Sequence, residues 1–153
     1  MKTLNTLTVL SATVLSALAA GIAAPAFAQE ALPPTYVVHK LTADGVQLRA
    51  LEAEDGIYEA KVLTTDGRIV KVGVDPRTGD LTDAYSHART RAAKAPEPAV
   101  NASQAIMAAA ATGYWDVREV DYEHGRWEIE ALNDQGRERT VTVDGITGAV
   151  GWD

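Results

Sequence analysis

The chain contains the stretch Tyr58-Glu-Ala-Lys-Val-Leu-Thr-Thr-Asp-Gly-Arg68 and, further along, the similar stretch Trp127-Glu-Ile-Glu-Ala-Leu-Asn-Asp-Gln-Gly-Arg137. The same spacing relates Val72-Gly-Val-Asp-Pro-Arg-Thr-Gly79 to Val141-Thr-Val-Asp-Gly-Ile-Thr-Gly148. Similarity at one fixed spacing is typical of a repeated structural unit. The sequence therefore predicts two copies of one small module.

Apolar and polar residues alternate within each copy. Trp127, Ile129 and Ala131 fall on one face of an extended strand, whereas Glu128 and Glu130 fall on the other face. A period of two is typical of a strand with one buried face and one face in solvent. We therefore expect a sheet whose outer face, in the second copy, is acidic.

Tight turns are expected where each copy places Asp and Gly in fixed positions. A hairpin between two extended runs needs a residue with positive φ, which glycine supplies. Before each Thr-Gly pair lies an aspartate whose carboxylate can accept hydrogen bonds from the turn amides. The predicted turn residues are Gly67, Gly136, Asp75, Gly79, Asp144 and Gly148.

Each copy is predicted to be a short helix followed by extended strands. In the first copy the helix is expected at 35–44 and the strands at 46–54, 57–64, 68–75 and 80–85. In the second copy the helix is expected at 102–112 and the strands at 114–123, 126–133, 137–144 and 149–153. The predicted fold is α+β, with two tandem modules that each pack a short helix on a three- to four-stranded antiparallel sheet.

Some local details stay open at the level of sequence. Either Asn101 or Ser103 is a candidate N-cap for the second helix. The stretch 115–120 breaks the alternation as a β-bulge would. Trp127 is expected to anchor the core. Trp152 is expected to close it, the alternative being a surface position that meets a partner.

The segment 1–28 has the features of a secretory signal peptide. Lys2 is followed by an apolar run, and the segment ends in Pro25-Ala-Phe-Ala28, which has the A-x-A form of a signal-peptidase site. We expect cleavage after Ala28, a periplasmic or secreted protein and no stable membrane anchor after cleavage; the alternative is an uncleaved anchor. The remaining chain divides into an extended leader at 29–34, repeat 1 at 35–85, a linker at 86–101 and repeat 2 at 102–153.

Composition excludes several classes of protein. The chain has no cysteine, so it has no disulfide, thiolate nucleophile or cysteine-ligated metal. Its net charge of −7 disfavours nucleic acid as a partner, because non-specific binding to phosphates needs a basic surface. The acidity is concentrated in residues 102–153, where 10 acidic residues and 4 arginines give −6, whereas 9 acidic and 6 basic residues in 35–85 give −3.

The residues that bear reactive groups do not form a recognisable catalytic or metal-binding motif. His39, His87 and His124 are far apart, and no H-E-x-x-H or G-x-S-x-G sequence occurs. Glu128 and Glu130 are weak candidates for a binding face, and we expect them to be solvated rather than buried as catalytic carboxylates would be. We therefore expect no enzyme activity, no catalytic residue, no cofactor and no metal site.

Taken in order, these motifs resemble the PepSY domain. The resemblance is carried by Gly113-Tyr-Trp-Asp-Val-Arg-Glu-Val120, the strand from Trp127, the Gly136-Arg137 hairpin and the turn Val143-Asp-Gly-Ile-Thr-Gly148. Repeat 1 matches from residue 57 to 81 and is looser before that.

The resemblance implies a peptidase propeptide-like module that binds a protein. It implies no catalytic residues. We expect an exported, non-catalytic binding module that inhibits or modulates an envelope or secreted peptidase. The alternative is an envelope protein that responds to a small ligand or cation through the acidic face of repeat 2.

Overall fold

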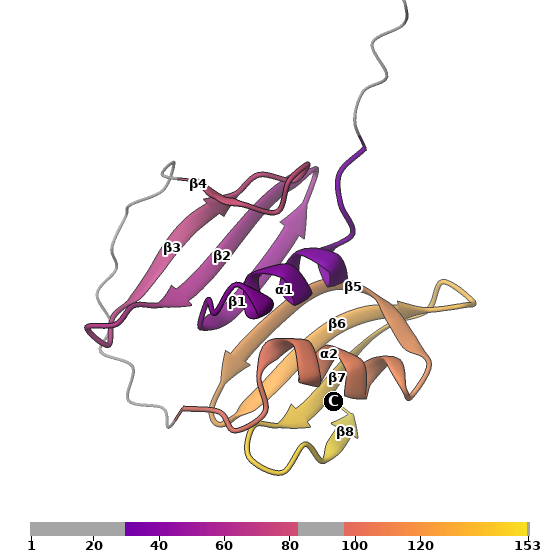
Figure 1. The fold of residues 1–153 in the computed structure, drawn as a ribbon. Coiled ribbons are helices and arrows are strands. Elements are labelled where there is room, and N and C mark those ends of the chain that lie inside the picture. The colour runs from indigo at the N-terminus through magenta and orange to yellow at the C-terminus, as the bar shows by residue number, and fades with distance from the viewer. Residues whose placement is uncertain (1–29, 83–96, 153) are drawn as a thin grey trace, which may run out of the picture.

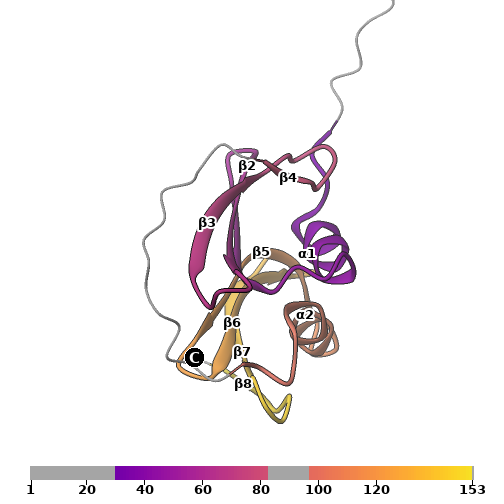
Figure 2. The ribbon, with the colours of Figure 1, turned by 60° about the vertical axis from the view of Figure 1, so that its left-hand side comes forward.

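A computed structural model describes residues 30–82 and 97–152 of the chain. Its strands form one continuous antiparallel sheet of eight, and both helices lie on the same face of that sheet (Figure 1, Figure 2). The predicted α+β fold is confirmed. The expected signal peptide at 1–28 and residues 86–96 of the expected linker lie outside the described residues.

The two repeats contain the same elements in the same order. Repeat 1 comprises α1 (Pro34–Ala43), β1 (Leu48–Glu54), β2 (Ile57–Leu63), β3 (Ile69–Val74) and β4 (Leu81–Thr82). Repeat 2 comprises α2 (Ala102–Ala110), β5 (Tyr114–Glu123), β6 (Arg126–Asn133), β7 (Glu138–Asp144) and β8 (Val150–Trp152).

The helices begin in different ways. Pro34 starts α1, where a missing N–H costs nothing because the first amides of a helix have no partner inside it. A capping box starts α2: the Asn101 side chain accepts from the Gln104 amide, and the Gln104 side chain accepts from the Asn101 amide, both at 2.9 Å. Ser103, the other candidate cap, instead joins the two helices through a hydrogen bond with His39.

The two repeats join edge to edge through β1 and β5, in the strand order β4-β3-β2-β1-β5-β6-β7-β8. Leu51 of β1 pairs directly with Val120 of β5, and these two residues occupy equivalent positions in the two repeats. A pseudo-twofold axis therefore passes through this pair. Both side chains are almost fully buried beneath the helices, so the seam between the repeats is part of one common core.

An aromatic residue in each repeat secures the chain that leads into its helix. Trp127 is fully buried, and its indole N–H donates to the Val100 carbonyl at 2.7 Å. Tyr58, the equivalent residue of repeat 1, donates its hydroxyl to the Leu32 carbonyl. The same side-chain position thus satisfies a carbonyl just ahead of each helix, because a buried polar group must find a partner.

β-Bulges interrupt the first strand of each repeat. The pairing register shifts at Arg49 in β1 and at the equivalent Arg118 in β5, and a further shift in β5 occurs at Trp115. The irregularity expected at 115–120 is therefore present as two bulges. Trp115 has no counterpart in repeat 1. Each later residue of repeat 2 is therefore one position further from α2 than the equivalent residue of repeat 1 is from α1. It is the one inserted residue.

The turns after β3 and β7 have the same geometry. Asp75 Oδ1 accepts from the amides of residues 77 and 78, at 2.7 and 3.3 Å. Asp144 Oδ1 accepts from those of residues 146 and 147, at 3.0 and 2.7 Å. The bonds from Thr147 and then Ile146 hold the pKa of Asp144 below its ordinary value. The turn glycines all have positive φ: Gly67 at 79°, Gly79 at 72°, Gly136 at 68° and Gly148 at 74°.

Candidate functional site

The face of the sheet opposite the helices is open within the described part of the chain (Figure 2). Helix-facing residues such as Leu51, Val120 and Ile129 are buried, whereas the residues that alternate with them carry mostly charged side chains. The two binding-face candidates from the sequence, Glu128 and Glu130, lie on this open face.

Four glutamates lie in register across four adjacent strands of the open face. Glu52 of β1 pairs with Glu59 of β2 on one side and with Glu119 of β5 on the other. Glu119 in turn pairs with Glu130 of β6. We call Glu59, Glu52, Glu119 and Glu130 the carboxylate row. Like charges directly opposite one another destabilise a sheet, so this arrangement carries a folding cost.

Basic side chains compensate only part of the acidic charge on this face. Lys71 binds Glu59, Lys61 binds Asp121 at 2.6 Å, and Arg126 binds Glu128 at 2.9 Å. No Lys, Arg or His nitrogen of residues 30–82 and 97–152 lies within 4.0 Å of the other three members of the row. Those three are Glu52, Glu119 and Glu130.

Glu119, at the centre of the row, is partly buried. Burial raises its pKa above the ordinary value, and the neighbouring carboxylates of Glu130, Glu52 and Asp121 raise it further. A carboxyl group in this setting gains from any cation that approaches the face. The described residues include no group of three or more acidic or histidine side chains placed to hold a metal ion. The row spreads its negative charge over four adjacent strands.

The structure places the two sequence candidates differently. Glu130 is part of the row, whereas Glu128 lies in the next register position, opposite Asp121, and is paired with Arg126. Sequence reasoning missed Glu52 and Glu59 of repeat 1. Glu59 pairs with Glu52 within repeat 1, but both join Glu119 in one row only through the pairing of β1 with β5, two strands that are distant in the chain.

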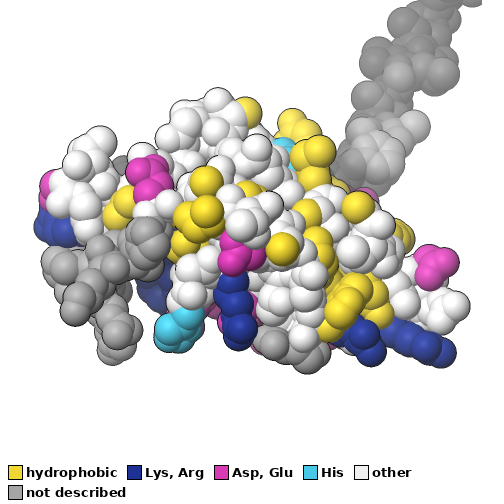
Figure 3. All heavy atoms as spheres, turned by 90° about the horizontal axis from the view of Figure 1, so that it is seen from below, with side chains coloured by type: hydrophobic (Ala, Val, Ile, Leu, Met, Phe, Trp, Pro, Cys, Tyr) yellow, Lys and Arg dark blue, Asp and Glu magenta, His cyan; other side chains and the backbone are white. Residues whose placement is uncertain are grey.

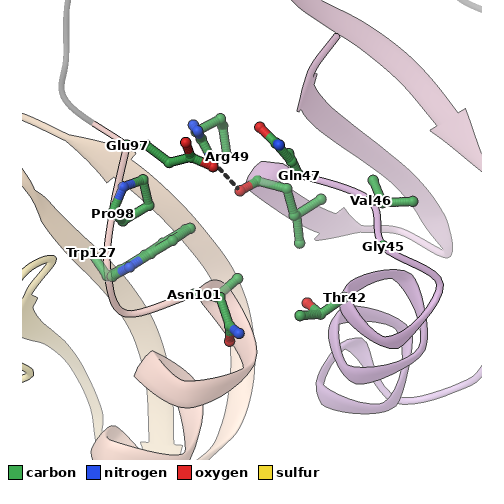
Figure 4. Close-up of a pocket in the computed structure, with 11 residues that line it drawn as sticks. Thr42, Gly45, Val46, Gln47, Arg49, Glu97, Pro98, Asn101 and Trp127 are labelled. Carbon is green, nitrogen blue, oxygen red and sulfur yellow. Dashed lines mark hydrogen bonds between the residues drawn. The ribbon is translucent and has the colours of Figure 1, made fainter. Parts of the chain in front are cut away.

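A second feature is a cavity of about 140 Å³ where the two repeats meet. It is lined by the end of α1, the start of β1, residues 97 and 98, and the start of α2. Figure 4 shows the side chains of Arg49 and Glu97 close together on one side of the cavity, with Thr42 and Asn101 toward the helices. Sequence reasoning did not single out any of these residues as a site.

The expectation that Trp152 closes the core is wrong. Its side chain is 47% exposed and lies edge-on to Tyr114, with ring centroids 5.5 Å apart, while the Arg139 guanidinium lies 5.5 Å from its ring. The strand β8 has only three residues and lies at the edge of the sheet that the described residues form. Hydrophobic side chains on the face seen in Figure 3 lie in several groups separated by polar atoms.

Comparisons with known proteins bear on the family. A family model described as "Peptidase propeptide and YPEB domain" matches the chain twice, at residues 7–85 and 82–151. No curated protein and no solved structure matches it. Within the described residues, neither helix is long and apolar enough to cross a membrane. The two matches span most of the chain, which therefore belongs to the PepSY family and carries two copies of its peptidase propeptide and YPEB domain in tandem.

Proposed function

We propose that this protein is an exported, non-catalytic binding module that modulates a secreted or envelope peptidase. The family match supports a propeptide-like or inhibitor-like module. The observation that carries the choice of surface is the carboxylate row. The partner is then a peptidase that presents a basic patch to the open face of the sheet.

The face is a better docking surface than the sheet edges. The edge strands β4 and β8 have only two and three residues. Short edges offer few free backbone groups to a strand added from a partner. The carboxylate row, by contrast, crosses the middle of the sheet and includes residues of both repeats. A partner bound there would therefore contact both repeats at once.

Electrostatics gives this surface a recognisable signature. Opposite charges across an interface accelerate association, and added salt weakens that effect because the Debye length falls to about 8 Å at physiological ionic strength. Three carboxylates of the row lack a basic partner among the described residues. We therefore expect binding that weakens steeply as salt is added.

The experiment measures casein hydrolysis by the peptidases that the producing cells secrete, with and without the purified protein. The triple variant Glu52→Gln, Glu119→Gln, Glu130→Gln is expected to weaken the effect roughly tenfold, since each exposed pair contributes about 0.5 kcal/mol. The control variant Glu54→Gln, Asp134→Asn, Glu138→Gln changes the net charge equally at exposed positions outside the row. Equal loss in both variants would contradict docking on the row.

A photo-crosslinker separates this surface from the helix face. Placed at Thr142 on the open face, it is expected to capture a peptidase in intact envelopes. Placed at Met107, which is 62% exposed on α2, it is expected to capture none. Failure of the Thr142 site to capture any envelope peptidase would count against the proposal.

A further inference from the structure

We propose that the cavity between the two repeats is a binding site for a small carboxylate, held by the guanidinium of Arg49. This site lies away from the carboxylate row and does not depend on the proposed action on a peptidase.

The burial of Arg49 is the observation that carries the proposal. Its side chain lines the cavity and the residue is only 8% exposed. A guanidinium has five N–H donors, yet with partners among the described residues this one makes a single hydrogen bond, from Nη1 to the Leu48 carbonyl at 3.2 Å. Its other contact is the Tyr122 ring, 5.8 Å away. Buried charges in proteins are normally paired, yet among residues 30–82 and 97–152 no carboxylate lies within 4.0 Å of this cation.

The cavity supplies a second polar group. The Thr42 hydroxyl is buried and, among the described residues, has no hydrogen-bond partner. Thr42 also lines the cavity, and so does Gln47, which brings an amide. Thr42 on α1 and Arg49 on β1 thus line one cavity from two different elements.

Size and charge define the ligand. A cavity of about 150 Å³ accepts a molecule as large as benzene, so this one has room for roughly four to six non-hydrogen atoms. A planar carboxylate matches the fork of a guanidinium. Glu97 at the cavity disfavours a doubly charged anion such as phosphate, because the second negative charge would face its carboxylate.

Repeat 2 shows that the bulge itself does not require a buried arginine. Arg118 occupies the equivalent bulge, but its side chain is 53% exposed and pairs with Asp116 at 3.3 Å. Arg49, by contrast, lines the cavity together with Ala102 and Trp127 of repeat 2. Burial lowers the pKa of Arg49, and the nearby Glu97 partly opposes that shift.

A competing explanation is that Glu97 is itself the partner of Arg49. Among the carboxylates, that of Glu97 is the one whose charge affects the pKa of Arg49. Even so, no carboxylate of residues 30–82 and 97–152 lies within 4.0 Å of the Arg49 guanidinium. The two explanations differ for Glu97→Gln. If the cavity takes an external carboxylate, the unaltered chain already binds it and this variant binds it more tightly. If Glu97 is the partner, only the variant binds it.

The test is a titration of the full chain with acetate and propionate, followed by amide NMR shifts and calorimetry. We expect saturable binding with a dissociation constant on the order of 1 mM, as suits so few ligand atoms, with shifts centred on Thr42 and Gln47. Acetamide, the uncharged isostere, should not bind. Arg49→Met should abolish binding and Arg49→Lys should weaken it at least tenfold, whereas Arg118→Met should leave it unchanged.

Two arms distinguish the source of the carboxylate. A short peptide with a free C-terminus that binds more tightly than acetate, while its amidated form does not bind, identifies a chain terminus. Failure of both peptides to bind, while acetate still binds, identifies a free acid. Absence of saturation up to about 100 mM acetate, roughly 100-fold above the expected constant, overturns the proposal. So does unchanged acetate binding in a folded Arg49→Met variant.

Discussion

Glu119 faces a carboxylate on each side, from Glu52 on β1 and Glu130 on β6. A glutamate in such a place lowers the stability of the fold. It persists only if other interactions offset that loss or if its charge serves a function. Cross-strand neighbours on one face contribute up to about 1 kcal/mol, and like charges act against stability. The position of Glu119 can therefore be tested by its effect on unfolding.

The pKa of Glu119 is raised in the folded protein, so its protonated form is favoured there. The contribution of Glu119 to the free energy of unfolding is thus most favourable below the ordinary glutamate pKa, and it is lost as pH rises from that value through the raised one. Glu119→Gln should raise the free energy of unfolding at pH 7 by about 0.5 kcal/mol and leave it unchanged at pH 3. Urea unfolding at the two pH values measures this. Glu138→Gln, opposite Leu132, is the control, and an equal gain there would refute the explanation.

At the scale of elements, α2 depends on its cap more than α1 does. Asn101→Ala removes the side-chain oxygen that satisfies the Gln104 amide and should lower the free energy of unfolding by about 1 kcal/mol. Asn101→Gly should cost only a few tenths of a kcal/mol, because glycine leaves the cap backbone accessible to water. Thermal unfolding followed by circular dichroism distinguishes the two. Equal effects would mean that the capping box does not stabilise the helix.

The elements themselves were largely predictable from sequence. Alternation at 127–131 and the Asp and Gly positions of the turns are local signals, and each strand obeys them because its neighbours lie close in the chain. For the N-cap of α2, the sequence leaves two candidates, Asn101 and Ser103. Trp152 was not predictable, because its exposure depends on which strand ends the sheet rather than on its own neighbours.

At the scale of the whole molecule, the shared sheet predicts that the repeats unfold together. All three tryptophans lie in repeat 2, at positions 115, 127 and 152, so tryptophan fluorescence reports on that repeat. Val74→Ala, in β3 of repeat 1, should nevertheless lower the fluorescence midpoint, with a loss of about 2 kcal/mol for the buried methyl groups. The equivalent Val143→Ala is the matched comparison. A fluorescence transition unaffected by Val74→Ala would show independent repeats.

The seam between the repeats is what sequence could not predict. The pairing of Leu51 with Val120, the carboxylate row and the enclosure of Arg49 all follow from one register between segments that are distant in the chain. Local patterns identify which face of a strand is buried but not which edge it joins. Arg49 and Arg118 show this directly, since the same bulge position is buried in one repeat and exposed in the other.

The pairing about Leu51 and Val120 has the geometry of an isologous dimer. Related residues meet at the axis, so each repeat offers the same edge to the other that a second copy of itself would offer. A covalent connection turns such an association into an intramolecular one, at an effective concentration on the order of millimolar. The tandem chain is thus equivalent to a dimer whose two subunits are covalently joined. Because its halves no longer have to be identical, one of them was free to bury an arginine and the other to gather acidic charge.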